Sequence, residues 1–273
     1  MAEPTRRCGV LGDPIEHSLS PVLHRAGYAA VGLDWTYDAH RVPAGGLPEF
    51  LAGLDPTWRG LSLTMPLKRE AMTLVDDVTP HATVSGAVNT LVLDDGLHGH
   101  NTDLPGAIAA IGERTDRSLG TAVVLGGGAT ATSVGLALCE LGVASFTLLV
   151  RSAARAAETR DALAAHPSRP EVRVESLAEP ALGAADIVVS TIPAAAQGAA
   201  LVSALAAAPC LFDVLYDPWP TPLATAAEGV VVSGLDLLVH QAVLQFTLFT
   251  GLPAPLAVMR AAGERALSER GAR

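Results

Sequence analysis

The sequence predicts an α/β protein built from two domains. Its length of 273 residues exceeds what one compact core commonly needs and suits two domains, each with its own apolar centre. The composition is 49% hydrophobic but only 4% aromatic, which is typical of tightly wound α/β proteins. Strand-like and helix-like segments also alternate along the chain. We expect residues 1–103 and 237–273 to form one domain and residues 104–236 the other.

The first domain is expected to alternate strands and helices and to end in a β-hairpin. Segments with strand or helix periodicity follow one another at residues 7–11, 21–31, 35–42, 47–54, 60–65 and 68–75. Residues 89–93 and 97–100 then flank Asp94, Asp95 and Gly96. Because an Asp-Gly pair supplies the positive φ of a tight turn, these two segments predict a hairpin.

The second domain is expected to contain six strands with helical crossovers. Strand-like runs occur at residues 121–125, 145–150, 171–175, 186–191, 210–215 and 229–232. Ala-rich helical segments separate most of them, and this alternation predicts a Rossmann sheet. After Gly234 the pattern is helical to the end, and we expect these C-terminal helices to return to the first domain.

Charge and hydropathy argue against nucleic acid and membranes as partners. The net charge is −10 and no Lys/Arg run occurs, which argues against nucleic acid or an anionic membrane surface. Residues 187–212 and 237–259 are uncharged over about the length of a membrane span, but prolines and polar side chains interrupt both. The N-terminus lacks the long apolar region of a cleaved signal. We expect a cytoplasmic protein, either a monomer or a homodimer.

Cysteines and histidines predict no disulfide and no metal site. Cys8, Cys139 and Cys210 are far apart and form no CxxC pair, so we interpret them as small core residues. His98 and His100 lie on one face of a predicted strand, but no third ligand lies nearby at a suitable spacing.

A Gly-rich turn predicts a dinucleotide site. Directly after a buried-strand run the sequence has the G-x-G-x-x-A spacing, and a helix follows. The first glycine permits the tight turn, the second lets the backbone approach a pyrophosphate, and the alanine allows close helix packing. The residues expected to contact the cofactor here are Gly126, Gly127, Gly128, Ala129, Thr130 and Ala131.

The end of the second strand of this domain indicates NADP(H) as the cofactor. An acidic residue there favours NAD, whereas a cation favours the 2′-phosphate of NADP. The sequence has Arg151, Ser152 and Arg155, which offer a guanidinium fork, a hydroxyl and a second cation. The alternative is that both arginines are simply solvated at a helix start.

A pair of serines in the first domain has two interpretations. Ser18 and Ser20 precede a predicted helix that begins at Pro21, and both hydroxyls can hold a carboxylate. Alternatively, Ser20 is an N-cap with proline at the first helical position, an arrangement that needs no ligand.

Further motifs occur in order along nearly the whole chain, and together they resemble the shikimate dehydrogenase family (shikimate/quinate dehydrogenases). Besides residues 12–21 (GDPIEHSLSP) and the Gly-rich turn, they are 62–68 (SLTMPLK), 86–91 (GAVNTL), 99–103 (GHNTD), 190–193 (STIP), 216–223 (YDPWPTPL) and 234–241 (GLDLLVHQ). The chain departs from the family pattern at Ser62, often Asn, at Leu104, where the family has Gly, and at Val150, often Asn.

The resemblance implies a role for each matching residue. Ser18 and Ser20 would hold the substrate carboxylate, and Tyr216 would line the same cleft. The residues implied to bind substrate oxygens and hydroxyls are Thr64, Asn89, Asp103 and Gln241. Those implied to border the cofactor beyond the turn and its basic patch are Thr191, Ile192, Gly234 and Leu235. The implied activity is NADPH-dependent, reversible reduction of 3-dehydroshikimate to shikimate, a step toward chorismate and aromatic amino acids.

Lys68 and Asp103 are the expected catalytic pair. Hydride delivery to a ketone leaves an alkoxide, whose charge must be stabilised and then neutralised by a proton. Lys68 can donate that proton, and Asp103 can orient the amine through a charge-assisted hydrogen bond. Three alternatives stay open: an NAD-dependent quinate/shikimate dehydrogenase, an aminoshikimate-type enzyme, and a non-catalytic NADP-binding sensor. Arg151 argues against the first, and the retained Lys/Asp pair argues against the last.

Overall fold

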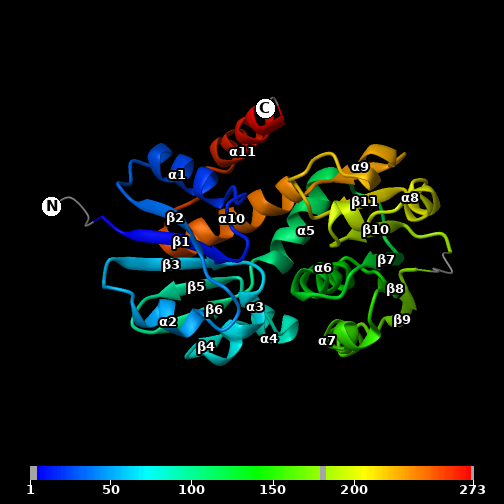
Figure 1. Cartoon of the computed structure of the whole chain (residues 1–273), viewed down its shortest axis with the longest axis horizontal. Helices are drawn as coiled ribbons and strands as arrows, with labels where there is room; N and C mark the ends of the chain where they lie inside the picture. The colour runs from blue at the N-terminus through cyan, green and yellow to red at the C-terminus, as the bar shows by residue number, and fades with distance from the viewer. Residues whose placement is uncertain (1–4, 179–182, 272–273) are drawn as a thin grey trace. The chain divides into compact units, whose positions relative to one another are not determined.

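A computed structural model describes residues 5–178 and 183–271 of the chain (Figure 1). These residues divide into two units, which we call unit 1 (up to Thr102, and again from Leu238) and unit 2 (Asp103–Leu237). Each bound lies one residue from the domain boundaries expected from the sequence.

Unit 1 contains a mixed six-stranded sheet in the order β2-β1-β3-β5-β6-β4. Strand β1 is parallel to β2 and β3, whereas β5 is antiparallel to both β3 and β6. The carboxyl ends of β1 and β3 therefore lie at the same sheet edge as the start of β5. The strands are β1 (Arg7–Gly12), β2 (Thr36–Arg41), β3 (Trp58–Leu63), β4 (Asp77–Val78), β5 (Thr90–Leu93) and β6 (Leu97–His100).

The predicted hairpin is confirmed as β5 and β6, which pair with Leu93 opposite Leu97. Asp95 and Gly96 both have positive φ, 53° and 151°. An Asp-Gly pair tolerates this backbone better than most residues do, which is why the turn was visible in the sequence.

The C-terminal helices return to unit 1, as predicted. A Cβ atom on Gly27 of α1 would lie 2.9 Å from a ring carbon of Phe246 in α10 and 3.3 Å from Met259 in α11. Glycine is thus needed on α1 for this close packing. The helices that contribute to unit 1 are α1 (Ser20–Ala30), α2 (Leu47–Ala52), α3 (Leu67–Glu70), η1 (Ala71–Thr73), α4 (Pro80–Ser85), α10 (Gly234–Thr250) and α11 (Leu256–Gly271).

Unit 2 contains six parallel strands in the order β12-β11-β10-β7-β8-β9, which confirms the predicted Rossmann sheet. The order reverses between β7 and β10, and ligands of such sheets bind beyond the carboxyl ends of the strands at that point. The strands are β7 (Thr121–Leu125), β8 (Ser145–Val150), β9 (Glu171–Ser176), β10 (Ile187–Ser190), β11 (Cys210–Asp213) and β12 (Val230–Val232).

Helices connect the parallel strands of unit 2, so its central strands are buried and apolar. The helices that lie wholly in unit 2 are α5 (Asp103–Arg114), α6 (Ala129–Glu140), η2 (Ala153–Ala156), α7 (Ala157–Ala164), η3 (Ala194–Ala196), α8 (Ala199–Leu205) and α9 (Pro222–Ala226). The uncharged run 187–212 thus holds two strands and the helices between them. In the part of the chain that the structure describes, no helix has the length and apolarity needed to cross a membrane. All three cysteines are free and buried, as expected.

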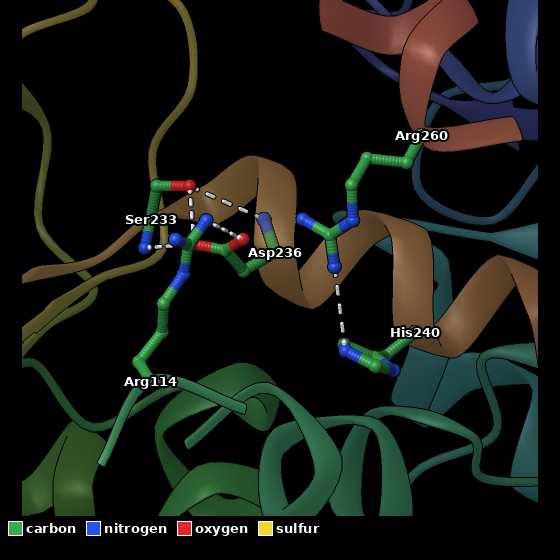
Figure 2. A network of polar contacts seen from close by, with 5 residues as sticks. All are labelled: Arg114, Ser233, Asp236, His240 and Arg260. Atoms are coloured by element: carbon green, nitrogen blue, oxygen red, sulfur yellow. Dashed lines mark hydrogen bonds and ion pairs between the residues drawn. The ribbon is translucent and has the colours of Figure 1, made fainter. Parts of the chain in front are cut away.

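The first turn of α10 is held by a buried carboxylate (Figure 2). Asp236 accepts hydrogen bonds from the backbone and hydroxyl of Ser233 at 2.9 and 2.8 Å, and its own N–H donates to Ser233 Oγ at 3.2 Å. This reciprocal pattern is a capping box. Arg114, at the end of α5, donates to the other Asp236 oxygen at 2.6 Å. Further along α10, His240 faces Arg260 of α11, with 3.5 Å between their nitrogens.

We expect Arg114→Ala to lower the free energy of unfolding by about 1–2 kcal/mol. The Asp236 side chain is 2% exposed and would keep its charge with one partner fewer, whereas Arg114 is 44% exposed, so the loss stays below the ~3–5 kcal/mol of a wholly buried pair. Urea denaturation of this variant and of Arg117→Ala, which removes an exposed arginine nearby, measures the difference. Equal midpoints would contradict this role for Arg114.

Candidate functional site

The sheet edge of unit 1 that follows β1 and β3 is closely packed. Thr64 N donates to Leu11 O at 2.9 Å, and a Cβ atom on Gly12 would lie 2.3 Å from Thr64 Cγ2. Only glycine permits this approach, which joins the segment leading to Ser18 with the segment that carries Thr64.

The structure rules out the N-cap interpretation of Ser20. Helix α1 begins at Ser20 itself, its N-cap residue is Leu19, and no side chain caps it. Ser20 is 4% exposed, and its N–H donates to Ser18 Oγ at 3.3 Å. The helix starts one residue earlier than the residue types suggested, so Ser20 is not a cap, whereas the Ser18 hydroxyl satisfies the N–H group of the first helical residue.

Thr64, Lys68 and Asn89 lie on adjoining backbone segments of unit 1. Leu63 N donates to Asn89 O at 2.7 Å, and Val88 N donates to Lys68 O at 2.7 Å. Lys68 is half-buried in the short helix α3. The first bond joins the end of β3 to the residue before β5, and the second joins α3 to the same segment.

The side chain of Asn89 is fixed by its neighbours. Its Oδ1 accepts from Thr102 N at 2.7 Å and from Thr90 Oγ1 at 2.9 Å, while its Nδ2 donates to Thr102 Oγ1 at 2.9 Å. Nδ2 also reaches Gln241 Oε1 on α10 at 3.4 Å. Unit 1 therefore brings Asn89 and Gln241 together, although they are far apart in the sequence.

A buried polar chain behind Asn89 was not predicted. Tyr37 donates its hydroxyl to Ser62 Oγ at 2.6 Å, Ser62 donates to Gln245 Oε1 at 2.7 Å, and Gln245 Nε2 donates to Thr90 Oγ1 at 2.9 Å. The family often has Asn where this chain has Ser62. Here the Ser62 hydroxyl accepts one hydrogen bond from Tyr37 and donates another to Gln245, so the serine has a structural role. One signal was available: Gln245 lies one helical turn after Gln241, on the same helix face.

The Gly-rich turn of unit 2 lies where the strand order reverses. Gly126 has φ of 103°, and a Cβ atom on it would lie 2.3 Å from Thr191 Oγ1, which donates to Leu125 O at 2.8 Å. A Cβ atom on Gly127 would lie 2.6 Å from that of Ala156. A Cβ atom on Gly128 would meet no described atom within 4 Å. Packing therefore explains the first two glycines and leaves the third unexplained.

Helix α6 begins at this turn with Gly128 as its N-cap, so the cap residue has no side chain to contribute. Ala129 and Thr130 form its half-exposed start, and Ala131 is fully buried, as its predicted packing role requires. Such a helix start presents backbone N–H groups and a partial positive charge. Thr159, which sequence reasoning missed, supports the turn by donating to Gly127 O at 2.9 Å.

The predicted basic patch directly follows β8. Arg151 and Arg155 are exposed, Ser152 is half-buried, and Ser152 O accepts from Arg155 N at 3.2 Å. Neither arginine forms an ion pair within residues 5–178 and 183–271. Both guanidinium groups are therefore available to an anion at this sheet edge.

The remaining predicted cofactor residues lie on the loop after β10 and at the start of α10. Gly234 N donates to Leu215 O at 3.1 Å, and a Cβ atom on Gly234 would lie 2.2 Å from Val214 O. The loop that follows β11 and carries the half-buried Tyr216 thus contacts the start of α10. Both Leu235 and Ile192 are 9% exposed.

Asp103 is the first residue of α5 in unit 2 and is 4% exposed, whereas Lys68 belongs to unit 1. Their pairing stays a prediction. The departures at Leu104 and Val150 lie in the core of unit 2, where both side chains are buried.

His98 has partners other than a metal. Its Nδ1 lies 2.7 Å from Asp77 Oδ2 and its Nε2 lies 2.9 Å from Asp94 O. Hydrogen bonding to these oxygens, first of all to the Asp94 carbonyl, raises the pKa of His98. In the described part of the chain, no three His, Cys, Asp or Glu side chains form a group that could hold a metal ion.

Comparisons with known proteins point in one direction. Residues 10–91 match the family described as the shikimate dehydrogenase substrate binding domain, and residues 234–262 match the shikimate 5'-dehydrogenase C-terminal domain. The chain is 37% identical to a shikimate dehydrogenase (NADP(+)) of Symbiobacterium thermophilum, over 97% of this chain and 95% of that protein. A solved shikimate dehydrogenase of Mycobacterium tuberculosis is 43% identical, with a TM-score of 0.85 over 96% of this chain and 99% of that one. A quinate dehydrogenase of Corynebacterium glutamicum in complex with NAD is 31% identical, with a TM-score of 0.86 over 96% and 99%.

Proposed function

The chain belongs to the shikimate dehydrogenase family, and we propose that it catalyses the reversible, NADPH-dependent reduction of 3-dehydroshikimate to shikimate. The observation that carries this proposal is that one chain contains both a set of predicted substrate residues and a set of predicted dinucleotide residues. Unit 1 gathers Thr64, Lys68, Asn89 and Gln241 on adjoining segments. Unit 2 has a Gly-rich turn and, further along the chain, a basic patch whose two arginines form no ion pair with the residues that the structure describes.

The residues of unit 2 fit a dinucleotide that carries an extra phosphate. Gly128 is not required by packing, and a glycine in open space at a helix start is what close approach of a pyrophosphate needs. The exposed Arg151 offers a planar fork for the 2′-phosphate, and Arg155 adds a second cation. When bound, NADPH would supply the hydride.

In the proposed reaction Lys68 supplies the proton. As charge develops on the substrate oxygen, the ammonium of Lys68 stabilises it and then transfers a proton to it. We assign to Asp103 the orientation of that amine and a hydrogen bond to a substrate hydroxyl. Ser18 and Ser20 are proposed to hold the substrate carboxylate, with Thr64, Asn89, Gln241 and Tyr216 as further contacts.

Initial rates measured with dehydroshikimate, using NADPH and NADH in parallel, test the proposal. We expect turnover with a preference for NADPH. Because a quinate dehydrogenase in complex with NAD is also similar to this chain, quinate is included as a second substrate for the reverse reaction. Preferential quinate oxidation with NAD would favour that activity instead, and tight NADP binding without turnover would indicate a sensor.

Arg151→Ala is expected to raise the KM for NADPH about 10–100-fold and to change the KM for NADH little. Losing a charge-assisted contact to the phosphate costs roughly 1.5–3 kcal/mol, which corresponds to one or two decades in affinity. The exposed Arg160, which pairs with Asp161 on α7, provides the matched control. An unchanged ratio of NADPH to NADH efficiency in Arg151→Ala would contradict the proposed phosphate contact.

We also propose a cytoplasmic enzyme that acts as a monomer or homodimer. Three buried free thiols suit a reducing compartment. Sedimentation at enzymatic concentration distinguishes the two oligomeric states.

A further inference from the structure

Asp213 is a buried carboxylate outside the proposed substrate and cofactor contacts. It ends strand β11 and is completely buried. Burial raises the pKa of Asp213, and the hydrogen bonds that it accepts oppose this shift. It forms no ion pair within the described residues. A buried carboxylate without a counter-ion is costly, so its contacts indicate what it is kept for.

Asp213 holds both ends of the loop 214–221. At the start of this loop, Leu215 N donates to Asp213 Oδ1 at 3.2 Å. At its end, Thr221 donates its hydroxyl to Asp213 Oδ2 at 2.7 Å. Thr221 is itself the N-cap of α9, where its Oγ1 accepts from Ala224 N at 3.1 Å. The loop between these anchors carries Tyr216.

Gln197 ties the same carboxylate to the preceding loop. Its Nε2 donates to Asp213 Oδ2 at 2.9 Å and to Ser190 Oγ at 3.1 Å, and its Oε1 accepts from Leu223 N at 3.0 Å. All of these side chains are at most 4% exposed. The segment 191–197, which starts with Thr191 at the Gly-rich turn, is therefore fixed to the base of loop 214–221.

Loop 214–221 also contacts the start of α10, where Gly234 and Leu235 are expected to border the cofactor. Val214 O and Leu215 O lie against Gly234, where α10 begins. One carboxylate thus lies at the centre of three loops that follow β10, β11 and β12, the strands on one side of the point where the sheet order reverses. Among the described residues, the hydrogen bonds of Asp213 and Gln197 do not reach the basic patch after β8.

We propose that Asp213 is a positioning residue for the reaction, acting through loop 214–221 on the placement of Tyr216 against the substrate; this rests on the proposed function. Asp213 touches neither substrate nor cofactor in this role. A displacement of about 1 Å in a substrate-positioning group can cost about 10²-fold in rate. The loss should therefore appear in kinetics with shikimate more than in the affinity for NADP.

Asp213→Asn and Thr221→Val test the proposal from both ends of one hydrogen bond. Asparagine keeps the shape but offers one acceptor fewer, and valine removes the hydroxyl that closes the loop. Each is expected to lower kcat and raise the KM for shikimate, with a combined loss of about 10–100-fold in kcat/KM. The Kd for NADP should rise less than the KM for shikimate, because Arg151 and Arg155 lie outside this network. Thr221→Ser, which keeps the hydroxyl, should stay within about twofold of the wild type.

A double-mutant cycle with Tyr216→Ala separates positioning from general loosening. If Asp213 acts through Tyr216, Asp213→Asn should cost much less in the Tyr216→Ala background than in the wild type. If the two losses simply multiply, or if Asp213→Asn and Thr221→Val lower only the melting temperature, the proposal is wrong.

Hydrogen exchange at the amides of Leu215 and Leu223 gives a readout that does not need turnover. At least one should exchange faster in Asp213→Asn, because the single oxygen of asparagine can accept from Leu215 N or from the side chains of Gln197 and Thr221 but not from both sides. Leu223 N depends on Gln197. Unchanged exchange would overturn the anchoring role. If the wild-type protein fails to oxidise shikimate, the proposed function fails, and the role of Asp213 in catalysis fails with it, whatever exchange shows for the loop.

Discussion

Replacing Lys68 by alanine is expected to lower kcat by about 10²–10⁴-fold while leaving the affinities for shikimate and NADP within a few-fold of the wild type. A general acid contributes mainly as charge develops on the reacting oxygen, so its loss affects the transition state more than the ground state. Lys68 lies in the short helix α3 and its backbone oxygen accepts from Val88 N, a bond that alanine keeps. Single-turnover rates and equilibrium binding measure the two effects separately.

Lys68→Arg is the informative companion to this variant. Arginine keeps a positive charge but holds its proton too tightly to act as an acid near neutral pH. If proton donation dominates, arginine should rescue little of the lost rate, whereas substantial rescue would indicate charge stabilisation alone. Near-wild-type kcat in a folded Lys68→Ala protein would remove Lys68 from the mechanism and require another proton donor.

Most of the fold could be predicted because local patterns agree with the tertiary structure. The six strands of unit 2 and the hairpin of unit 1 were visible from apolar runs and from the Asp95-Gly96 turn. Helix α5 was not predicted, and it contains Pro105 and Gly106, two residue types that commonly interrupt helices. The structure places them in the first helical turn, where a proline lacks no needed N–H group.

The site could be predicted only where its residues form compact motifs. The Gly-rich turn and the arginines after β8 are local in sequence, and the structure places each at the sheet edge expected of it. The contacts of Asp213 with Gln197 and Thr221 depend on loops that meet only in the folded sheet. A carboxylate at the end of an otherwise apolar strand was the one available signal. Ser20 shows the opposite case, since residue type offered a cap as the alternative interpretation and the backbone does not form it.

His24 is a buried titratable group that links the packing of unit 1 to pH. It lies on α1, is fully buried, and stacks on Tyr37 with 4.2 Å between ring centroids and 7° between planes. Neither ring nitrogen has a hydrogen-bond partner of normal geometry within the described residues. Burial lowers the pKa of His24 to about 3, and the side chain of Gln245 only partly opposes this shift. The folded protein therefore holds this histidine neutral.

We expect this burial to make the protein lose stability in mild acid. An unfolded-state histidine has a pKa of about 6.5, so between that value and the folded-state pKa the unfolded chain binds more protons. The contribution is complete above about pH 6.5 and falls by roughly 1.4 kcal/mol per pH unit as the pH drops. In His24→Phe, which keeps an aromatic ring in the cluster, the free energy of unfolding should therefore depend on pH less steeply, by about 1.4 kcal/mol per pH unit between pH 4.5 and 6.

Urea denaturation across this pH range measures the slope of the free energy of unfolding for the wild type and for His24→Phe. Replacing the exposed His81 by Gln is the matched control. The wild type and His24→Phe share every other titratable group, so the difference between their slopes reports His24. Parallel curves for the wild type and His24→Phe would mean that the folded protein admits a proton at His24 without loss of packing.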